Sequence, residues 1–267
     1  KGLGYGPQDI IGKTGIELAF NAELVGRAGG MQVQVDSKGN KDKVLGYKVP
    51  VKGSDLVLTL DLDLQKIAEG QLEGKRGAIV VLDVATGGVL AMVSAPAFDP
   101  SVFVESAKRK ERQAVLLDQK KPLLNRAIAG VYPAGSVFKT IVGLAGLESR
   151  GILPGTRYYC PGQFQLGTTV FHCWRKHGHG TLDLEEALKY SCNVFFYHAA
   201  LDTGQSRIES MSRAFGLGER TGSILPGESA GLLPSPEWKK KMGLGSWTKG
   251  DTVNFSIGQG YVLTTPL

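Results

Sequence analysis

The sequence predicts an α+β protein in which an antiparallel sheet is flanked by helices. Two apolar runs, 78–83 and 89–94, are joined through Thr86-Gly-Gly88, a pattern typical of a β-hairpin. A third apolar run, with helical spacing, follows Ser136. Apolar residues make up 42% of the 267 residues, enough for a substantial core. The length allows one large domain, or one large domain with a small module.

Residues 1–54 are predicted to form the small module, which is rich in β-structure. Glycine is frequent there and long apolar periods are missing. The segment 31–35 alternates apolar and polar residues like a strand, 36–40 is turn-forming, and 44–51 returns as a second strand. We therefore place a domain boundary after residue 54 and assign residues 55–267 to the larger domain.

The larger domain begins with a strand predicted over 57–60. A helix follows, capped by Asp61 or Asp63 and continued by apolar residues at helical spacing as far as Leu72. The hairpin comes next, and the mixed segment 97–130 is expected to contain helices. Further helices are predicted over 136–150, 184–190 (behind a capping box that starts at Asp183), 194–203 and 207–215.

The chemically most informative segment is Ser136-Val-Phe-Lys139. A serine and a lysine three residues apart share one face of a helix, so the amine can reach the hydroxyl. A serine hydroxyl is a weak nucleophile until a base takes its proton. A lysine amine serves as that base when burial among apolar groups lowers its pKa. We therefore predict Ser136 as a nucleophile and Lys139 as its base.

A second tetrad, Ser246-Trp-Thr-Lys249, has the same S-x-x-K pattern. It is followed by Gly250-Asp251 instead of an apolar helical run. Because its surroundings are rich in glycine, we interpret it as a surface loop.

Ser191-Cys-Asn193 is the only S-x-N segment of the chain. Residues i and i+2 of an extended turn point the same way, so Ser191 and Asn193 are expected to face one cleft. A second serine can relay a proton to a leaving amine, and an asparagine amide can donate to and accept from a peptide-like substrate. The alternative is that Asn193 caps the helix that follows it, and both interpretations can hold together.

With these motifs the chain resembles the penicillin-binding protein and serine β-lactamase superfamily. The segments 178–180 and 193–197 resemble its elongation type, penicillin-binding protein 2. The resemblance extends over essentially the whole chain and implies a non-catalytic pedestal for 1–54 and a transpeptidase domain for 55–267. Further segments similar to class B penicillin-binding proteins are 12–17, 58–65, 90–96, 125–127, 132–136 and 256–260.

The family's third motif, K-T/S-G, lies on a strand well after G-Q-G, and only seven residues follow Gly260. Lys13-Thr14-Gly15 has the right letters but lies in the pedestal segment, so we assign it no catalytic role. We expect a transpeptidase domain that is truncated before the third motif, with the C-terminal strands of its sheet missing. The family's N-terminal membrane anchor is also expected to be missing, since no apolar run approaches 18 residues.

The resemblance implies a serine-type D-Ala-D-Ala transpeptidase that crosslinks peptidoglycan stem peptides during cell elongation. Ser136 would attack the D-Ala-D-Ala carbonyl with Lys139 as base, Ser191 would pass a proton to the leaving amine, and Asn193 would hold the stem peptide and Lys139. β-Lactams, which imitate D-Ala-D-Ala, would acylate the same serine. The implied place of action is the periplasmic face of the bacterial inner membrane. The implied protein partners are a membrane glycosyltransferase of the elongation machinery and morphogenesis proteins.

Two other functions stay open at this point. A β-lactamase or β-lactam sensor would use the same catalytic residues, and a non-catalytic scaffold would fit a chain without the third motif. A nucleic-acid partner is not expected, because the net charge is a modest +6 and no dense basic run is interleaved with aromatic residues.

The cysteines suggest a structural metal, although no cofactor is expected for catalysis. Cys160, Cys173, His179 and Cys192 supply four ligands of the kind that bind tetrahedral zinc, with His177 as an alternative to His179. The resemblance favours this interpretation, since some elongation-type relatives carry a metal at matching positions. A Cys160–Cys173 disulfide with Cys192 buried and free is the rival, which an extracytoplasmic compartment permits. A third possibility is that the cysteines form no bond at all.

Overall fold

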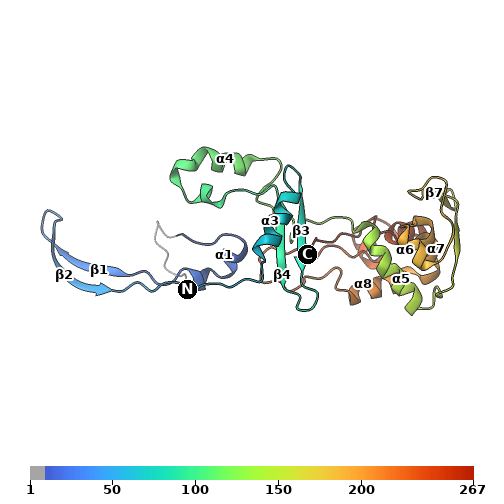
Figure 1. Ribbon diagram of the computed structural model, residues 1–267, viewed down its shortest axis with the longest axis horizontal. Helices are drawn as coiled ribbons and strands as arrows, with labels where there is room; N and C mark the ends of the chain where they lie inside the picture. The colour runs from blue at the N-terminus through green and yellow to red at the C-terminus, as the bar shows by residue number, and fades with distance from the viewer. Residues whose placement is uncertain (1–9) are drawn as a thin grey trace. The chain divides into compact units, whose positions relative to one another are not determined.

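The computed structural model describes residues 10–267, which divide into two compact units (Figure 1). The first unit contains residues 10–123 and 222–228, and the second contains 124–221 and 229–267. Helices and antiparallel strand pairs occur in both units, which confirms the predicted α+β class. The first nine residues of the predicted pedestal lie outside the described part of the chain. The predicted domain boundary after residue 54 stays a prediction.

The first unit opens with α1 (Gly15–Ala19), α2 (Asn21–Leu24) and a hairpin of β1 (Gly30–Val35) with β2 (Lys41–Lys48). The predicted turn at 36–40 is confirmed, because the Asp36 carboxylate accepts the backbone N–H groups of Lys38 and Asn40 at 2.8 and 2.9 Å. Short bonds of this kind satisfy the backbone while the chain reverses. β2 therefore begins at Lys41, directly after the turn, and not at residue 44 as predicted.

A second hairpin, β3 (Gly77–Leu82) with β4 (Val89–Ala95), carries α3 (Leu62–Gln71) on one face (Figure 1). α3 begins as predicted, since the Asp61 carboxylate accepts the N–H groups of the first helical turn. Burial is concentrated where helix and sheet meet, at Ala68, Ala91 and Val93. The sequence pattern therefore predicts the helix and the hairpin correctly.

The strand predicted over 57–60 is wrong. The segment makes isolated contacts with β4, in which the Thr59 hydroxyl donates to the Val89 carbonyl at 2.7 Å and the Asp61 N–H donates to the Leu90 carbonyl at 2.8 Å. Val57 is 98% exposed, so its apolar side chain does not mark a buried face. An apolar run becomes a strand only when a neighbouring strand pairs with it continuously.

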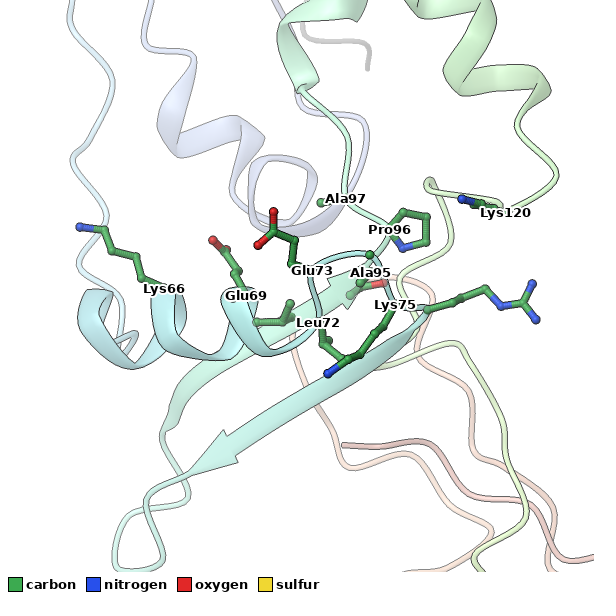
Figure 2. A pocket seen from close by; sticks show the side chains of 14 residues that line it. Lys66, Glu69, Leu72, Glu73, Lys75, Ala95, Pro96, Ala97 and Lys120 are labelled. Atoms are coloured by element: carbon green, nitrogen blue, oxygen red, sulfur yellow. The ribbon is translucent and has the colours of Figure 1, made fainter.

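The segment expected to contain helices forms two short 3₁₀ turns and one α-helix. These are η1 (Pro100–Phe103), η2 (Ser106–Lys108) and α4 (Arg109–Leu117). A cavity of about 680 Å³ lies beside α3 and the end of β4, where Glu69, Glu73 and Pro96 line it together with Lys120 (Figure 2). Its lining residues include none of the predicted catalytic or metal-binding residues.

The second unit is mainly helical and carries four short strands that the sequence pattern does not predict. Strands of three or four residues are too short to produce a recognisable period. The helix predicted from Ser136 begins as a 3₁₀ turn, η3, and becomes α-helical at Lys139. The elements are η3 (Gly135–Phe138), α5 (Lys139–Glu148), β5 (Tyr158–Cys160), β6 (Gln163–Leu166), β7 (Thr169–His172), β8 (Gly180–Leu182), α6 (Leu184–Lys189), α7 (Asn193–Thr203), α8 (Gln205–Ala214), α9 (Pro236–Lys241) and α10 (Lys249–Phe255).

α7 forms the centre of this unit. Seven of its 11 residues are buried, and it contacts α5, α6, α8 and α10. The Phe138 ring is buried at the start of α5 and packs against Phe255 of α10 with ring centroids 4.9 Å apart. Among the helices in residues 10–267, none is long and apolar enough to cross a lipid bilayer.

Replacing Phe138 by alanine is expected to lower the free energy of unfolding by about 3–5 kcal/mol, because the ring is 1% exposed and its removal leaves a cavity. Chemical denaturation with parallel circular dichroism measures this change. Val137→Ala is the matched control, since the neighbouring side chain is 74% exposed and should contribute little. Equal destabilisation by the two substitutions would contradict the packing described here.

Candidate active site

The loop that carries Ser136 is held at two points by a segment near the end of the described chain. The Gly135 N–H donates to the Gly258 carbonyl at 2.9 Å, and a Cβ added to Gly258 would lie 2.2 Å from the Gly135 carbonyl oxygen. Glycine is therefore required for this approach. Tyr132 and Thr264 form an antiparallel bridge with bonds of 2.9 and 2.8 Å. These contacts fix the backbone before Ser136 and leave its side chain exposed.

Lys139 lies one turn after Ser136 and is 1% exposed. Its Nζ donates to three acceptors: the Ser191 carbonyl at 2.9 Å, Ser191 Oγ at 3.0 Å and Asn193 Oδ1 at 2.6 Å. Burial lowers the pKa of Lys139 to about 8, although the charges of the nearby cysteine thiolates act in the opposite direction. A lysine with this pKa is neutral in about one molecule in ten at pH 7. The site thus holds an amine that can accept a proton under ordinary conditions.

Ser191 Oγ lies between the Ser136 hydroxyl, the predicted nucleophile, and the Lys139 amine. It lies 3.0 Å from Ser136 Oγ and 3.0 Å from Lys139 Nζ. A hydroxyl both donates and accepts, so this path can carry protons in either direction. When Lys139 is charged, the bonds point from the ammonium through Ser191 to Ser136. When Lys139 is neutral, the two hydroxyls can turn so that Ser136 donates to Ser191 and Ser191 to the amine.

The turn between α6 and α7 presents Ser191 and Asn193 to Lys139. Ser191 has a φ of +51°, a left-handed conformation that is uncommon outside glycine. The N-cap of α7 is Cys192, whose Sγ accepts the Phe195 N–H at 3.5 Å. Asn193 is the first helical residue, so the alternative that it caps α7 is wrong. The structure thereby brings together all four predicted catalytic residues.

Cys160, Cys173, His179 and Cys192 form a second cluster directly behind this turn. Their ligand atoms all lie within 4.8 Å of one another, and the three cysteines are buried and unpaired. The Sγ atoms of Cys160 and Cys173 each lie 3.6 Å from His179 Nδ1. Ligands bound to one zinc ion at about 2.0–2.3 Å are separated by about 3.5–4 Å, so the donor types and the two distances to His179 Nδ1 fit this metal. The Cys160–Cys173 disulfide is not formed in the structure.

Backbone geometry explains why His179, and not His177, belongs to this cluster. A Cβ on Gly178 would lie 2.0 Å from the Cys160 carbonyl oxygen, so the chain can cross β5 closely only with glycine before His179. His177 stays exposed. The Cys173 and Cys192 side chains share a hydrogen bond, which lowers the pKa of Cys173 and, together with burial, raises the pKa of Cys192.

Trp174, which no sequence pattern indicates, also contacts the site. Its indole Nε1–H donates to the carbonyl oxygens of Tyr190 and Ser191 at 3.0 and 3.2 Å. A tertiary hydrogen bond from an exposed side chain leaves no period or motif in the sequence. The nearest available signal is its position directly after Cys173.

The two competing motifs lie away from this site, but the prediction that the whole Ser246–Lys249 tetrad is a surface loop is wrong at its end, because a helix begins at Lys249. Ser246 belongs to an exposed loop, and Lys249 begins α10 behind the capping box formed by Thr248 and Asp251. The tetrad is therefore a helix start and not a nucleophile with its base. Lys13-Thr14-Gly15 leads into α1 of the first unit.

Comparison with known proteins identifies relatives along the whole chain. Residues 77–267 match the family model of the penicillin binding protein transpeptidase domain, and residues 1–58 match that of the penicillin-binding protein dimerisation domain. A protein of Acinetobacter baumannii, named peptidoglycan D,D-transpeptidase MrdA, is 40% identical over 98% of this chain and 39% of its own length.

Two solved structures share the fold closely. A Helicobacter pylori penicillin-binding protein (PBP2), solved in complex with MreC, has a TM-score of 0.86 and 37% identity over 96% of this chain and 48% of its own. A chain of a peptidoglycan synthase complex has a TM-score of 0.86 and 38% identity over 98% of this chain and 48% of its own. The chain thus spans less than half the length of these three relatives. Its motifs, its fold and the match over residues 77–267 together show that the chain belongs to the penicillin-binding protein transpeptidase family.

Proposed function

We propose that this protein is a peptidoglycan D,D-transpeptidase that crosslinks stem peptides through an acyl-enzyme on Ser136. The observation that carries the proposal is the hydrogen-bonded path from the exposed Ser136 hydroxyl through Ser191 to the buried amine of Lys139. Such a path joins a nucleophile that a substrate can reach to a base shielded from water. The name of the Acinetobacter baumannii relative, peptidoglycan D,D-transpeptidase, supports the same reaction.

In the acylation step, neutral Lys139 accepts a proton through Ser191 while Ser136 Oγ attacks the carbonyl of the penultimate D-Ala. An ester forms between Ser136 and this carbonyl, and the peptide bond to the terminal D-Ala breaks. The proton returns from Lys139 through Ser191 to the leaving amine. Asn193 Oδ1, 2.6 Å from the Lys139 amine, holds the base in place during both transfers.

In the second step, the amine of another stem peptide attacks the ester carbonyl. Lys139 takes a proton from this amine, a new peptide bond forms, and Ser136 leaves with its proton restored. One peptide bond has been exchanged for another and no water is consumed. β-Lactams would acylate Ser136 in the same way as the first substrate, because their ring amide imitates D-Ala-D-Ala.

The proposed protein partners and location follow from the relatives. One similar structure is a complex of PBP2 with MreC, and another belongs to a complex described as coordinating polymerization and crosslinking. These descriptions support a role beside a membrane glycosyltransferase and a morphogenesis protein during cell elongation. The periplasmic face of the inner membrane is the place where such partners and the stem peptides meet.

We propose in addition that Cys160, Cys173, His179 and Cys192 hold a structural zinc ion. With four protein ligands, such an ion has no open position for a water or a substrate, so its contribution is to stability. Cys192 is the middle residue of Ser191-Cys-Asn193. Zinc would therefore tie the turn that presents Ser191 and Asn193 to the end of β5, which carries Cys160, and to the loop between β7 and β8, which carries Cys173 and His179.

The acyl-enzyme is tested by intact-protein mass spectrometry of the full-length protein after incubation with benzylpenicillin. One drug should add per molecule, and Ser136→Ala should abolish the adduct because no nucleophile remains. Ser246→Ala is the matched control and should keep it, since Ser246 lies in the other S-x-x-K tetrad. An adduct that survives Ser136→Ala would refute the assignment, and rapid hydrolytic release of the drug would indicate a β-lactamase.

The pH dependence of acylation tests the role of Lys139. Because the neutral amine is the base, the second-order rate constant for benzylpenicillin should rise with pH and level off above the Lys139 pKa of about 8. Below that pH the rate should fall about tenfold per unit, as the neutral fraction does. A profile that is flat between pH 6 and 9, a range spanning about three units, would exclude Lys139 as the base.

The zinc site is tested by elemental mass spectrometry of the purified protein. About one zinc per molecule is expected, and His179→Ala should lower both the zinc content and the melting temperature because a ligand is lost. His177→Ala is the matched control and should retain the metal, since this neighbouring side chain is exposed and outside the cluster. A zinc content unaffected by His179→Ala would contradict the proposed ligand set.

A further inference from the structure

The indole of Trp174 is placed in a way that core packing does not explain. The side chain is 63% exposed, yet its polar edge points toward the protein and donates to the carbonyl oxygens of Tyr190 and Ser191 at 3.0 and 3.2 Å. These two carbonyls belong to the peptide groups on either side of the Ser191 Cα. A single donor thus contacts both peptide groups whose rotation defines φ and ψ of Ser191.

Ser191 needs such support, because its φ of +51° lies in the left-handed region that residues with a side chain rarely adopt. Its backbone conformation sets the direction of its Cα–Cβ bond and hence the position of Oγ. That oxygen lies 3.0 Å from both Ser136 Oγ and Lys139 Nζ. A rotation of either flanking peptide group would move Oγ away from one of them and interrupt the proton path.

The surroundings of Trp174 connect it to the cysteine cluster. It directly follows Cys173, and the His179 ring packs against the Trp174 ring at 5.2 Å and the Tyr190 ring at 6.2 Å between centroids. The Ser191 carbonyl also accepts the Lys139 ammonium at 2.9 Å. The indole and the lysine therefore approach the same oxygen, one from the exposed loop and the other from the buried side.

We propose that Trp174 is a positioning residue for acyl transfer, acting through its N–H on the backbone of Ser191 to hold the Ser191 hydroxyl between Ser136 and Lys139. The inference rests on the proposed function of the site. According to this proposal, Trp174 affects the rate at which Ser136 is acylated and does not affect the non-covalent binding that precedes acylation.

Trp247 offers a matched comparison within the same unit. Its indole Nε1–H also donates a hydrogen bond, to Thr252 Oγ1 at 2.8 Å, and its ring contacts Phe255 with centroids 6.0 Å apart. These contacts belong to α10 and its approach loop and do not include Ser191. Trp247→Phe therefore removes an equivalent donor without touching the proton path.

The test measures benzylpenicillin acylation of the full-length protein, separating the acylation rate constant from the dissociation constant of the complex that precedes it. Trp174→Phe keeps an aromatic ring and removes the N–H. It should lower the rate constant about 3- to 10-fold, the range for one net hydrogen bond, and leave the dissociation constant unchanged. Trp247→Phe should change neither constant by more than about twofold. β-(3-Benzothienyl)alanine at position 174 keeps the size of the bicyclic ring and replaces only the N–H by sulfur. It should lower the acylation rate constant to the same extent as Trp174→Phe, and it provides the test if Trp174→Phe folds poorly.

An unchanged acylation rate constant in the benzothienyl variant would overturn the proposal. So would a change confined to the dissociation constant, because the ring would then contact the ligand and would not position Ser191. Wild-type protein that forms no Ser136 adduct would refute the proposed function itself. That result is read from the wild type alone, so it is distinguishable from a failure of the Trp174 proposal.

Discussion

The arrangement of the helices in the second unit depends on how the buried Lys139 amine, a potential charge, is hydrogen-bonded. An ammonium group removed from water needs hydrogen-bond acceptors, and Ser191 and Asn193 supply them. These acceptors lie more than fifty residues further along the chain, on the turn that leads into α7. The position of α5 relative to α7 is thus set by a polar contact as well as by the apolar surfaces that the two helices share.

The apolar core fixes the positions of the residues that make this polar contact. Phe138 lies between Ser136 and Lys139 in sequence and anchors the start of α5 against Phe255 of α10. The same helix α10 leads into Gly258, whose carbonyl holds the loop before Ser136. In this short segment, Phe138 packs in the core, while Ser136 and Lys139 on either side of it belong to the candidate site. Ser136 and Val137 face solvent, while Phe138 and Lys139 are buried.

How much of this could be predicted from the sequence depends on how local each feature is. The proximity of Ser136 to Lys139 follows from helical spacing, and the hairpin and capped helices follow from equally local patterns. That Ser191 connects the two residues requires the packing of α7 on α5, which no single segment encodes. The strand predicted over 57–60 failed for the same reason, because pairing with a neighbour is not a local property.

The cysteine cluster and Trp174 show the same limit. The residue types and spacing of Cys160, Cys173 and Cys192 suggest metal ligands, but the choice of His179 over His177 depends on the close approach of Gly178 to the Cys160 backbone. Trp174 lies in a loop without regular structure and donates to Tyr190 and Ser191, which lie 16 and 17 residues further along the chain. Neither fact has a counterpart in composition or periodicity.

The turn Ser191-Cys-Asn193 has a consequence for how the protein can evolve. Its outer residues bond Lys139 while its middle residue, fully buried, belongs to the cluster with His179. Two neighbouring sites with different requirements thus share three consecutive positions. Under the proposed function, a substitution at this turn that changes the acylating site falls on Cys192 or directly beside it, and so next to the cysteine cluster. The turn therefore has little freedom to vary, and tolerated substitutions are expected on the surrounding loops instead.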